Sequence, residues 1–394
     1  MIVKLNERTG MFLWMLGLVI APYVLRDRFI PQIVAVVNVV SICGVLLIAK
    51  KHFVKRKGWS QAIFYSLLFA AFFLMLLKTR SPSTIFKRIV CNFFPLILLD
   101  MKCLDRKRFE ETYSIILKVI TVSIGLIAAC AVVDVATGWR VSKAIANLYG
   151  ADSLGSMVRD SRLVSYFGHS LVTTEVVLIF YILHIINEFY VIKRYKMVWQ
   201  TIVSVFLIAL TGSKTGLVLI VALIMLVYGN RKMLKYIPVL CLVVLVGYQM
   251  GVFDKLLERL ISGLESGDIT TGRISAFIKM RKMGVLDFHW FSGHSSAMYE
   301  KFPGLIAALE NPILRWAYNS GIAFAIVMTL LVFVIPVLKM LKYKDMRLLL
   351  AALIYIVDVN TYDTVCSLGD SMLRYCTVIY IITSAMNYVF EEKR

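Results

Sequence analysis

Two long apolar stretches, residues 236–252 (YIPVLCLVVLVGYQMGV) and 314–338 (LRWAYNSGIAFAIVMTLLVFVIPVL), enclose the longest polar stretch of the chain, residues 253–313. A helix needs about 20 apolar residues to cross the hydrocarbon core of a bilayer, so each stretch predicts a membrane-spanning helix. The loop between them must lie outside the lipid hydrocarbon, because its backbone groups need water or protein partners. Together the three segments predict a helical membrane protein that holds a large loop at one membrane surface.

The composition of the whole chain extends this prediction to all of it. Apolar residues make up 59% of the 394 residues and charged residues 17%, whereas soluble domains are closer to half apolar and a quarter charged. We therefore predict an all-α, polytopic integral membrane protein that forms a single domain over residues 1–394. Its transmembrane helices, about 12 in number, are expected at residues 10–25, 30–49, 60–77, 85–100, 113–137, 171–192, 197–212, 214–230, 236–252, 314–338, 347–361 and 371–390.

Lysine and arginine residues gather in alternate short loops of this topology, beginning with the N-terminus. Cytoplasmic loops carry such an excess, so both termini are predicted to be cytoplasmic. The two long loops, about 138–170 and 253–313, then face outward. The membrane surface accounts for the net charge of +20, and nucleic acid is not an expected partner. The seven cysteines form no C-x-x-C pair, so neither a disulfide framework nor a metal framework is predicted.

The second long loop begins with a helical pattern. Apolar residues from Phe253 to Leu264 recur at intervals of three and four residues. This spacing predicts an amphipathic helix that lies along the membrane interface. Another helix is predicted after it, with Ile274, Phe277 and Ile278 on one face.

Arg273 is the residue of this next helix that helix formation alone does not explain. Asp268, Thr270 and Thr271 are candidates for its N-cap, and Gly284 suits the left-handed position that ends a helix. Arg273 would then lie in the first turn, where a cation opposes the helix dipole at a cost of about 0.3–1 kcal/mol. An anion bound at that end would offset the cost, so the pattern predicts an anion beside Arg273.

The end of the same loop brings a carboxylate and a cation to the start of the next span. Pro312 suits the first turn of a helix, which would place Glu310 and Arg315 at the outer membrane surface. The two residues are either an ordinary interface anchor or a general base, Glu310, beside an anion clamp, Arg315. His294 is a second candidate for the base, whereas His289, between Phe and Trp, is more typical of interfacial packing. The spacing of these residues fits no metal site.

The first long loop and one tight turn supply further cations. Arg159, Arg162 and His169 lie near the end of the first loop. They are either solvated residues near headgroups or a lid for an anionic substrate, since the planar guanidinium binds phosphate through two hydrogen bonds. Lys214 lies in the turn Gly-Ser-Lys-Thr between two apolar segments. That turn is similar to the end of a P-loop. The first glycine of the motif and the preceding strand are missing, so the sequence does not predict a nucleoside triphosphatase.

Ionisable residues also occur near the last predicted outward turn. Asp358, Asp363, Asp370 and Arg374 cluster there. Charged groups inside membrane segments are usually paired, so an ion pair among these residues is expected to close the helix bundle.

Four segments, in this order along residues 138–321, resemble the O-antigen polymerase and O-antigen ligase superfamily of bacterial surface-polysaccharide enzymes. The resemblance lies in the loop ending Arg162–His169, in the turn Thr211–Gly216, in Thr271–Arg273 followed by Gly284, and in Glu310–Leu314 followed by Asn319–Gly321. The last three are similar to that family's Gly-Ser-Arg-Thr, Arg-ten-Gly and His-Asn-x-x-Leu elements. The chain departs from the pattern with Lys214 in place of an Arg, with Glu310 in place of a ligase-type His, and with no Arg-ten-Gly spacing in the first loop.

This resemblance implies a GT-C-like, metal-independent glycosyltransferase, without a cofactor, on the outer face of the bacterial plasma (inner) membrane. Its substrates would be oligosaccharide repeat units on undecaprenyl diphosphate, which it joins into polysaccharide. Its partners would be membrane lipid, a flippase and a chain-length regulator. The residues expected to hold diphosphate or sugar are Arg273, Arg162, Arg159, Lys214, Arg315 and His169. Glu310 is the expected base and His294 the second candidate.

Three other functions remain open at this point. A ligase would transfer finished chains to a lipid A core, but the histidine expected at position 310 is a glutamate. A transporter or flippase for lipid-linked units would place charge at the membrane midplane on broken helices, whereas the charges here lie mainly in outward loops. A structural subunit without chemistry would leave Arg273 unexplained.

Overall fold

The computed structural model describes residues 2–31, 34–52, 59–78, 81–101, 103, 106–149, 161–229, 235–249, 251–265, 272–295, 297–362, 364–366 and 369–392, and most of these residues are helical. No strand occurs in these ranges. Within these ranges, each apolar segment for which the sequence predicts a span is mainly helical. The all-α prediction is therefore confirmed for the described part of the chain.

The first half of the chain consists of α-helices together with short π-helical and 3-10 segments. The elements are α1 (Ile2–Met15), η1 (Leu16–Ile20), α2 (Tyr23–Phe29), α3 (Val36–His52), α4 (Trp59–Lys78), α5 (Pro82–Arg88), η3 (Ile89–Phe93), η4 (Phe94–Leu99), α6 (Arg106–Thr137), α7 (Arg140–Tyr149), α9 (Ser170–Ile186) and η5 (Asn187–Val191).

The second half contains both apolar helices and the helices of the second long loop. They are α10 (Val198–Thr211), α11 (Lys214–Tyr228), α13 (Ile237–Gln249), α14 (Asp254–Glu265), α15 (Arg273–Lys282), α16 (Ala297–Lys301), α17 (Gly304–Ala308), α18 (Pro312–Ser320), α19 (Ile322–Thr329), η6 (Leu330–Val334), α20 (Ile335–Leu341), α21 (Met346–Asn360), η7 (Thr364–Cys366) and α22 (Ser371–Glu392).

Several of these helices can cross a membrane. In the described ranges, four are long and apolar enough by themselves: Pro82–Leu99, Phe109–Thr137, Ser170–Val191 and Ile322–Leu341. A fifth candidate, Thr9–Ile20 with Tyr23–Phe29, bends by 82° at Pro22, which lacks the N–H needed to continue a helix. Four apolar helices are shorter: Val36–Ile48, Gln61–Leu77, Val198–Thr211 and Lys214–Tyr228. The chain is therefore a polytopic membrane protein by the length and composition of its helices.

The segment 314–338 differs from its predicted form, because the structure breaks it at Gly321. This residue has φ 99° and ψ 158°, a conformation essentially restricted to glycine. A Cβ at Gly321 would lie 2.7 Å from the carbonyl oxygen of Trp290. The long apolar helix therefore starts at Ile322, and α18 belongs to the loop.

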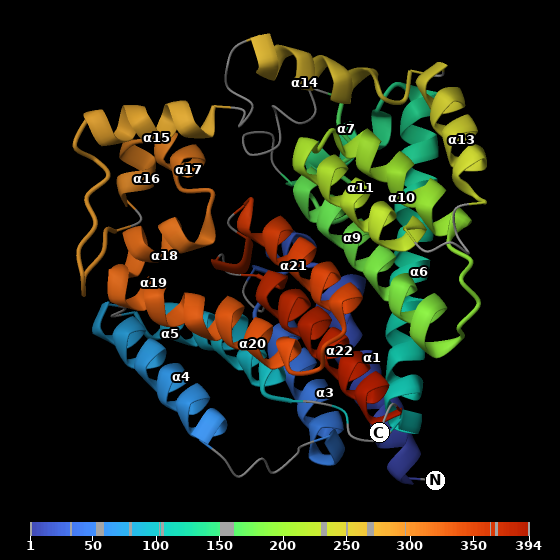
Figure 1. Ribbon diagram of the computed structural model, residues 1–394. Helices are drawn as coiled ribbons and strands as arrows, with labels where there is room; N and C mark the ends of the chain where they lie inside the picture. Colours follow the sequence, from blue (N-terminus) through green and yellow to red (C-terminus); the bar gives the residue numbers. More distant parts are fainter. Residues whose placement is uncertain are drawn as a thin grey trace.

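The helices form one large bundle with a smaller unit at one end (Figure 1). The bundle has a continuous apolar core in which α9 and α22 are almost fully buried. The smaller unit consists of α15 to α18 around a separate core of Met280, Val285, Leu305, Leu309 and Tyr318. The start of α1 and the end of α22 lie at the opposite end of the bundle from α14 and α15 (Figure 1).

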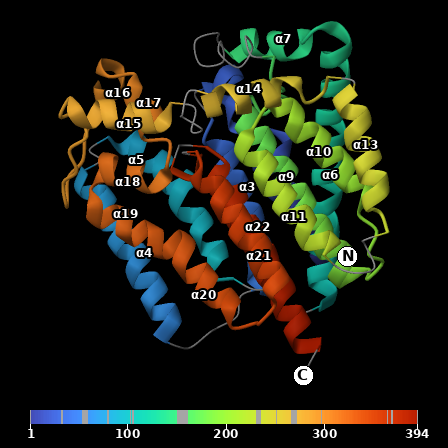
Figure 2. The same cartoon turned by 45° about the horizontal axis from the view of Figure 1, so that its top comes forward.

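The amphipathic helix predicted from Phe253 to Leu264 is confirmed as α14, which crosses the ends of α10 and α11 (Figure 2). Phe253 and Leu256 are buried against Ala209 of α10. Ile261 and Leu264 are 53% and 66% exposed. The helix thus packs one end of its apolar stripe on the bundle and leaves the other end open to its surroundings.

Candidate functional site

Arg273 and Glu310 form an ion pair in the smaller helical unit, between the Nε atom of Arg273 and the Oε2 atom of Glu310. The two side chains are 33% and 29% exposed, while the Oε2 atom of Glu310 itself is buried. The sequence predicts an anion beside Arg273. The structure places the chain's own carboxylate there.

Glycine residues mark both ends of α15, the helix that begins with Arg273. Gly272 occupies the N-cap position with φ 87° and supplies no side-chain cap; the predicted cap residues Asp268, Thr270 and Thr271 lie outside the described residues. At the other end, the N–H of Val285 donates to the carbonyl of Met280 and that of Gly284 to Arg281, both at 3.0 Å. With Gly284 at φ 68°, this is a Schellman motif. The predicted helix and its glycine stop are confirmed.

Of the three apolar residues that the sequence places on one face of α15, only Phe277 packs into the small core. Ala276, Phe277 and Met280 pack into the small core, while Ile274 and Ile278 are 56% and 47% exposed. The difference arises because α17 packs on the side of α15 that carries Met280. Ile274 and Ile278 therefore lie on the outer side of α15, away from the small core.

Asn311 fixes the position of Glu310. Its Oδ1 atom accepts hydrogen bonds from the N–H groups of Ile313 at 3.0 Å and Leu314 at 3.2 Å, and so caps α18. Its Nδ2 atom donates to the carbonyl of Asn360 at 3.0 Å, at the end of α21. Pro312 is the first residue of α18, as the sequence predicts. Glu310 is thus tied both to the small unit and to the bundle.

Arg315 lies on α18, five residues after Glu310, and faces an aromatic ring. Its guanidinium carbon is 5.4 Å from the ring centroid of Tyr299, whose hydroxyl donates to Asn319 Oδ1 at 2.9 Å. Burial raises the pKa of the Tyr299 hydroxyl above its usual value, and the charge of Arg315 opposes that rise. Arg315 is held by this cation–π contact near, but not in, the Arg273–Glu310 pair.

His294 has a packed position in the same unit. Its ring stacks on Tyr318 with a centroid separation of 4.3 Å, and its Nε2–H donates to the carbonyl of Asp287 at 2.6 Å. The backbone N–H of His294 donates to the carbonyl of Tyr318 at 2.9 Å. These contacts hold the loop 285–295 against α18. The described contacts bring His294 to Tyr318 and not to Glu310.

A second group of cations surrounds the turn between α10 and α11. Gly212 has φ 62°, and Ser213 caps α11 by accepting from the N–H of Gly216 at 3.0 Å, which puts Lys214 at the first helical position. Arg162, only 8% exposed, donates from Nε to the carbonyl of Thr211 at 2.7 Å. Arg259 of α14 donates from Nη1 to the carbonyl of Gly212.

His169 lies close to this turn as the N-cap of α9. Its Nδ1 atom accepts the N–H of Leu171 at 3.1 Å. Burial lowers the pKa of the imidazole from 6.5 to about 4, and the nearby charge of Arg162 acts in the same direction. His169 is therefore neutral at pH 7 and serves as a hydrogen-bond acceptor.

The predicted site residues thus divide between two places. Arg273, Glu310, Arg315 and His294 lie in the unit α15–α18, while Arg162, His169 and Lys214 lie at the α10–α11 turn. Arg159 falls outside the described residues. Arg259 is a member of the second group that the sequence prediction omits. Its signal was a cation at the edge of the apolar stripe of α14, three residues after Leu256.

Charged residues are also buried within the bundle. Glu175 of α9 is fully buried and accepts from Tyr355 at 3.0 Å, Tyr362 at 2.9 Å and Arg374 at 3.2 Å. Asp370 pairs with Arg26 instead. Among the described residues, the predicted cluster is therefore paired with other helices: Arg374 pairs with Glu175 on α9, and Asp370 pairs with Arg26 on α2. Asp363 lies outside the described residues.

The described residues contain no group of three or more His, Cys, Asp or Glu side chains arranged to hold a metal ion. No protein-family model, no curated protein and no solved structure matches this chain. The function must therefore be argued from the arrangement of its residues.

Proposed function

We propose that the chain is a metal-independent glycosyltransferase that polymerises surface polysaccharide. It would join oligosaccharide repeat units carried on undecaprenyl diphosphate at the outer face of the bacterial plasma membrane. The observation that carries the proposal is the Arg273–Glu310 pair, a partly exposed cation and carboxylate at the N-terminal ends of α15 and α18. A diphosphate leaving group requires a cation, and an acceptor hydroxyl requires a base.

The proposed reaction begins when the substrates replace the contact between Arg273 and Glu310. The diphosphate of the donor takes the place of the Glu310 carboxylate on Arg273. The freed carboxylate then accepts the proton of the acceptor sugar hydroxyl, whose oxygen attacks the anomeric carbon. The bond from that carbon to the diphosphate oxygen breaks, and the lipid diphosphate leaves with its charge balanced by Arg273. Arg315, held over Tyr299, would bind the sugar or the second phosphate.

The proposed topology is a GT-C-like bundle of twelve spans with both termini in the cytoplasm. Where the structure describes them, the predicted apolar segments are mainly helical. Four apolar helices are shorter than the long ones, and a locally thinner bilayer would accommodate them. The start of α1 and the end of α22 share one end of the bundle, opposite α14 and α15 (Figure 1). This arrangement supports an outer location for Arg273 and Glu310.

The direct test uses the purified protein in lipid nanodiscs with lipid-linked repeat units as the only substrate. Wild type should produce a ladder of longer chains, and Arg273→Ala should lower the rate at least about a hundredfold, as loss of one charge-stabilising donor does. Arg281→Ala is the matched control, because Arg281 is an exposed cation on the same helix. The proposal fails if wild type gives no ladder, or if the two variants behave alike.

A transporter of the same lipid-linked units is the second candidate, favoured by the buried ion pairs Glu175–Arg374 and Arg26–Asp370. Charges inside the membrane often mark a transport path. Proteoliposomes loaded with lipid-linked units separate the two functions. A transporter moves the units across the bilayer without changing their length, whereas the polymerase lengthens them without moving them.

A further inference from the structure

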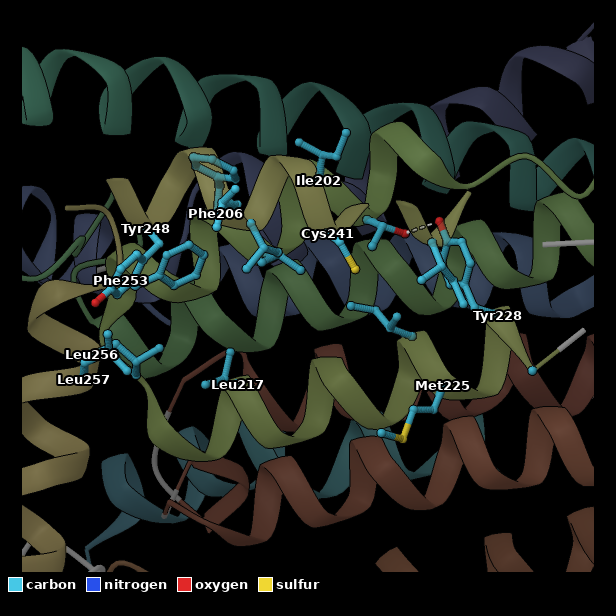
Figure 3. A pocket seen from close by; sticks show the side chains of 17 residues that line it. Ile202, Phe206, Leu217, Met225, Tyr228, Cys241, Tyr248, Phe253, Leu256 and Leu257 are labelled. Carbon is cyan, nitrogen blue, oxygen red and sulfur yellow. Dashed lines mark hydrogen bonds between the residues drawn. The ribbon is translucent and has the colours of Figure 1, made fainter. Parts of the chain in front are cut away.

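A long apolar groove runs along the bundle between α10, α11 and α13, with α14 across one end (Figure 3). Its volume is about 960 Å³. The side chains that line it include Phe253, Leu256 of α14, Leu217 of α11, Tyr228, Cys241 and Leu245. A space of this size is comparable with ligand sites, which are roughly 300–1,000 Å³.

The chemistry of the groove excludes polar ligands from most of its length. Two of its hydroxyl groups are engaged by protein: that of Thr201 lies 3.2 Å from the hydroxyl of Tyr228 and 2.9 Å from that of Tyr181. Met225 and Leu245, on the flank of the groove, are 70% and 57% exposed. The groove therefore opens sideways, toward the hydrocarbon if the bundle spans a membrane, and suits an apolar chain.

One end of the groove carries positive charge. Leu217 and Leu256 line it and lie one helical turn from Lys214 and Arg259 respectively, on the same helix faces. Arg259 and Arg162 both bind carbonyl groups of the turn at Gly212. Two acidic residues of α14, Asp254 and Glu258, are close to Arg259 in sequence, and both are exposed. An apolar groove that ends at three cations is complementary to a lipid with an anionic head.

We propose that this groove binds a polyprenyl chain whose phosphate lies at the turn among Arg162, Lys214 and Arg259. The choice of a polyprenyl chain rests on the proposed function, which brings such a carrier to the protein. Aromatic side chains of the groove, among them Phe206, Tyr248 and Phe253, offer broad apolar faces to the methyl branches of the chain. The site is separate from the Arg273–Glu310 pair.

The test uses wild-type protein in phosphatidylcholine nanodiscs and a sugar-free polyprenyl diphosphate that carries a diazirine near the middle of its chain. Light should cross-link the probe to residues of α10, α11 and α13, as mapped by mass spectrometry of peptides. Cys241→Trp fills the groove and should lower labelling at least about tenfold, which corresponds to 1.4 kcal/mol. Leu242→Trp is the control, because Leu242 is 61% exposed and points away from the groove lining.

The charged end has its own variant. Arg259→Gln should weaken labelling by about tenfold, while Arg281→Gln, which removes an equal charge from an exposed position on α15, should not. Competition then identifies the occupant. Unlabelled polyprenyl diphosphate should abolish labelling, whereas the same amount of phosphatidylglycerol should leave it unchanged.

Several outcomes overturn the proposal. Labels that map outside α10, α11 and α13 in wild type refute the groove, whether or not the tryptophan variants fold. Displacement by phosphatidylglycerol at equal concentration shows a phospholipid site instead. The assay involves no chain growth, and it reads only the labels on peptides of α10, α11 and α13. Labelling without a polysaccharide ladder therefore refutes only the proposed polymerase, and a ladder without groove labelling refutes only this site.

Discussion

Arg273 and Glu310 can be separated experimentally into a structural role and a chemical one. The pair is about one-third exposed, and ion pairs at such positions contribute about 0–1 kcal/mol to stability. The exchange Arg273→Glu with Glu310→Arg keeps two opposite charges in contact. We expect the exchanged protein to melt within a few degrees of wild type. Under the proposed function, its rate of chain growth should fall at least about a hundredfold.

The controls are the two single changes, which leave like charges together. They should melt lower than the exchanged protein and be equally inactive. Activity in the exchanged protein would show that the two positions act only through their attraction, and that neither contacts substrate.

His169 gives the stability of the protein a pH dependence with a defined sign. Its pKa is 6.5 in an unfolded chain and about 4 in the folded one. Between these values the unfolded chain takes up a proton that the folded chain excludes. Stability contributed by neutral His169 is therefore complete above pH 6.5 and is lost as pH falls toward 4. Protonation would also remove the Nδ1 acceptor that caps α9.

The measurement is the melting temperature in detergent between pH 7.5 and 4.5, compared with His169→Asn. Asparagine is a good N-cap that does not titrate. The variant should lose less stability than wild type over this range. Parallel curves for the two proteins would mean that His169 is not held neutral by its surroundings.

The helix α15 ends at Gly284, whose backbone has a left-handed conformation. A Cβ at Gly284 would meet no atom within 4 Å, yet its φ is 68°. Gly284→Ala should therefore cost about 1 kcal/mol through backbone strain alone, with faster hydrogen exchange in the last turn of α15. Gly125 in α6 also has open space around a Cβ and has no positive φ, so Gly125→Ala should leave the melting temperature unchanged or raised. Equal destabilisation by both changes would contradict this account.

The elements themselves could be predicted from sequence because their signals are local. The apolar spacing of α14, the Gly284 stop of α15 and Pro312 at the start of α18 each depend on a few neighbouring residues. The break at Gly321 could not be predicted in this way. It depends on the backbone of Trp290, which approaches from a different part of the loop. The buried face of α15 likewise depends on where α17 packs.

At the scale of the whole molecule, buried ion pairs connect distant parts of the chain. Glu175 on α9 and Arg374 on α22 are 199 residues apart. Removal of one partner from a buried pair costs about 3–5 kcal/mol, because it leaves an uncompensated charge. Arg374→Met should therefore lower the melting temperature sharply. The double change Glu175→Gln with Arg374→Met should recover much of the loss, and a double variant as unstable as the single one would contradict this.

Such long-range pairing is what the sequence could not provide. It showed a cluster of charges around Asp370 and Arg374, but their partners Arg26 and Glu175 lie in other helices. For the candidate site, the sequence supplied the residue types and the need for an anion beside Arg273. It did not identify Glu310 as that anion, because no local pattern connects residues 37 positions apart.

The contact between Arg273 and Glu310 also determines which molecules can use this surface. An anion that arrives from the membrane must displace a carboxylate that the fold keeps permanently at a high effective concentration. Single-charged phospholipid headgroups are abundant at a bilayer surface but compete poorly with such a tethered rival. A diphosphate, with more charge and more acceptor oxygens, competes better. Glu310 would thus prevent abundant phospholipids from binding Arg273. A scarce lipid with a diphosphate headgroup could still displace it.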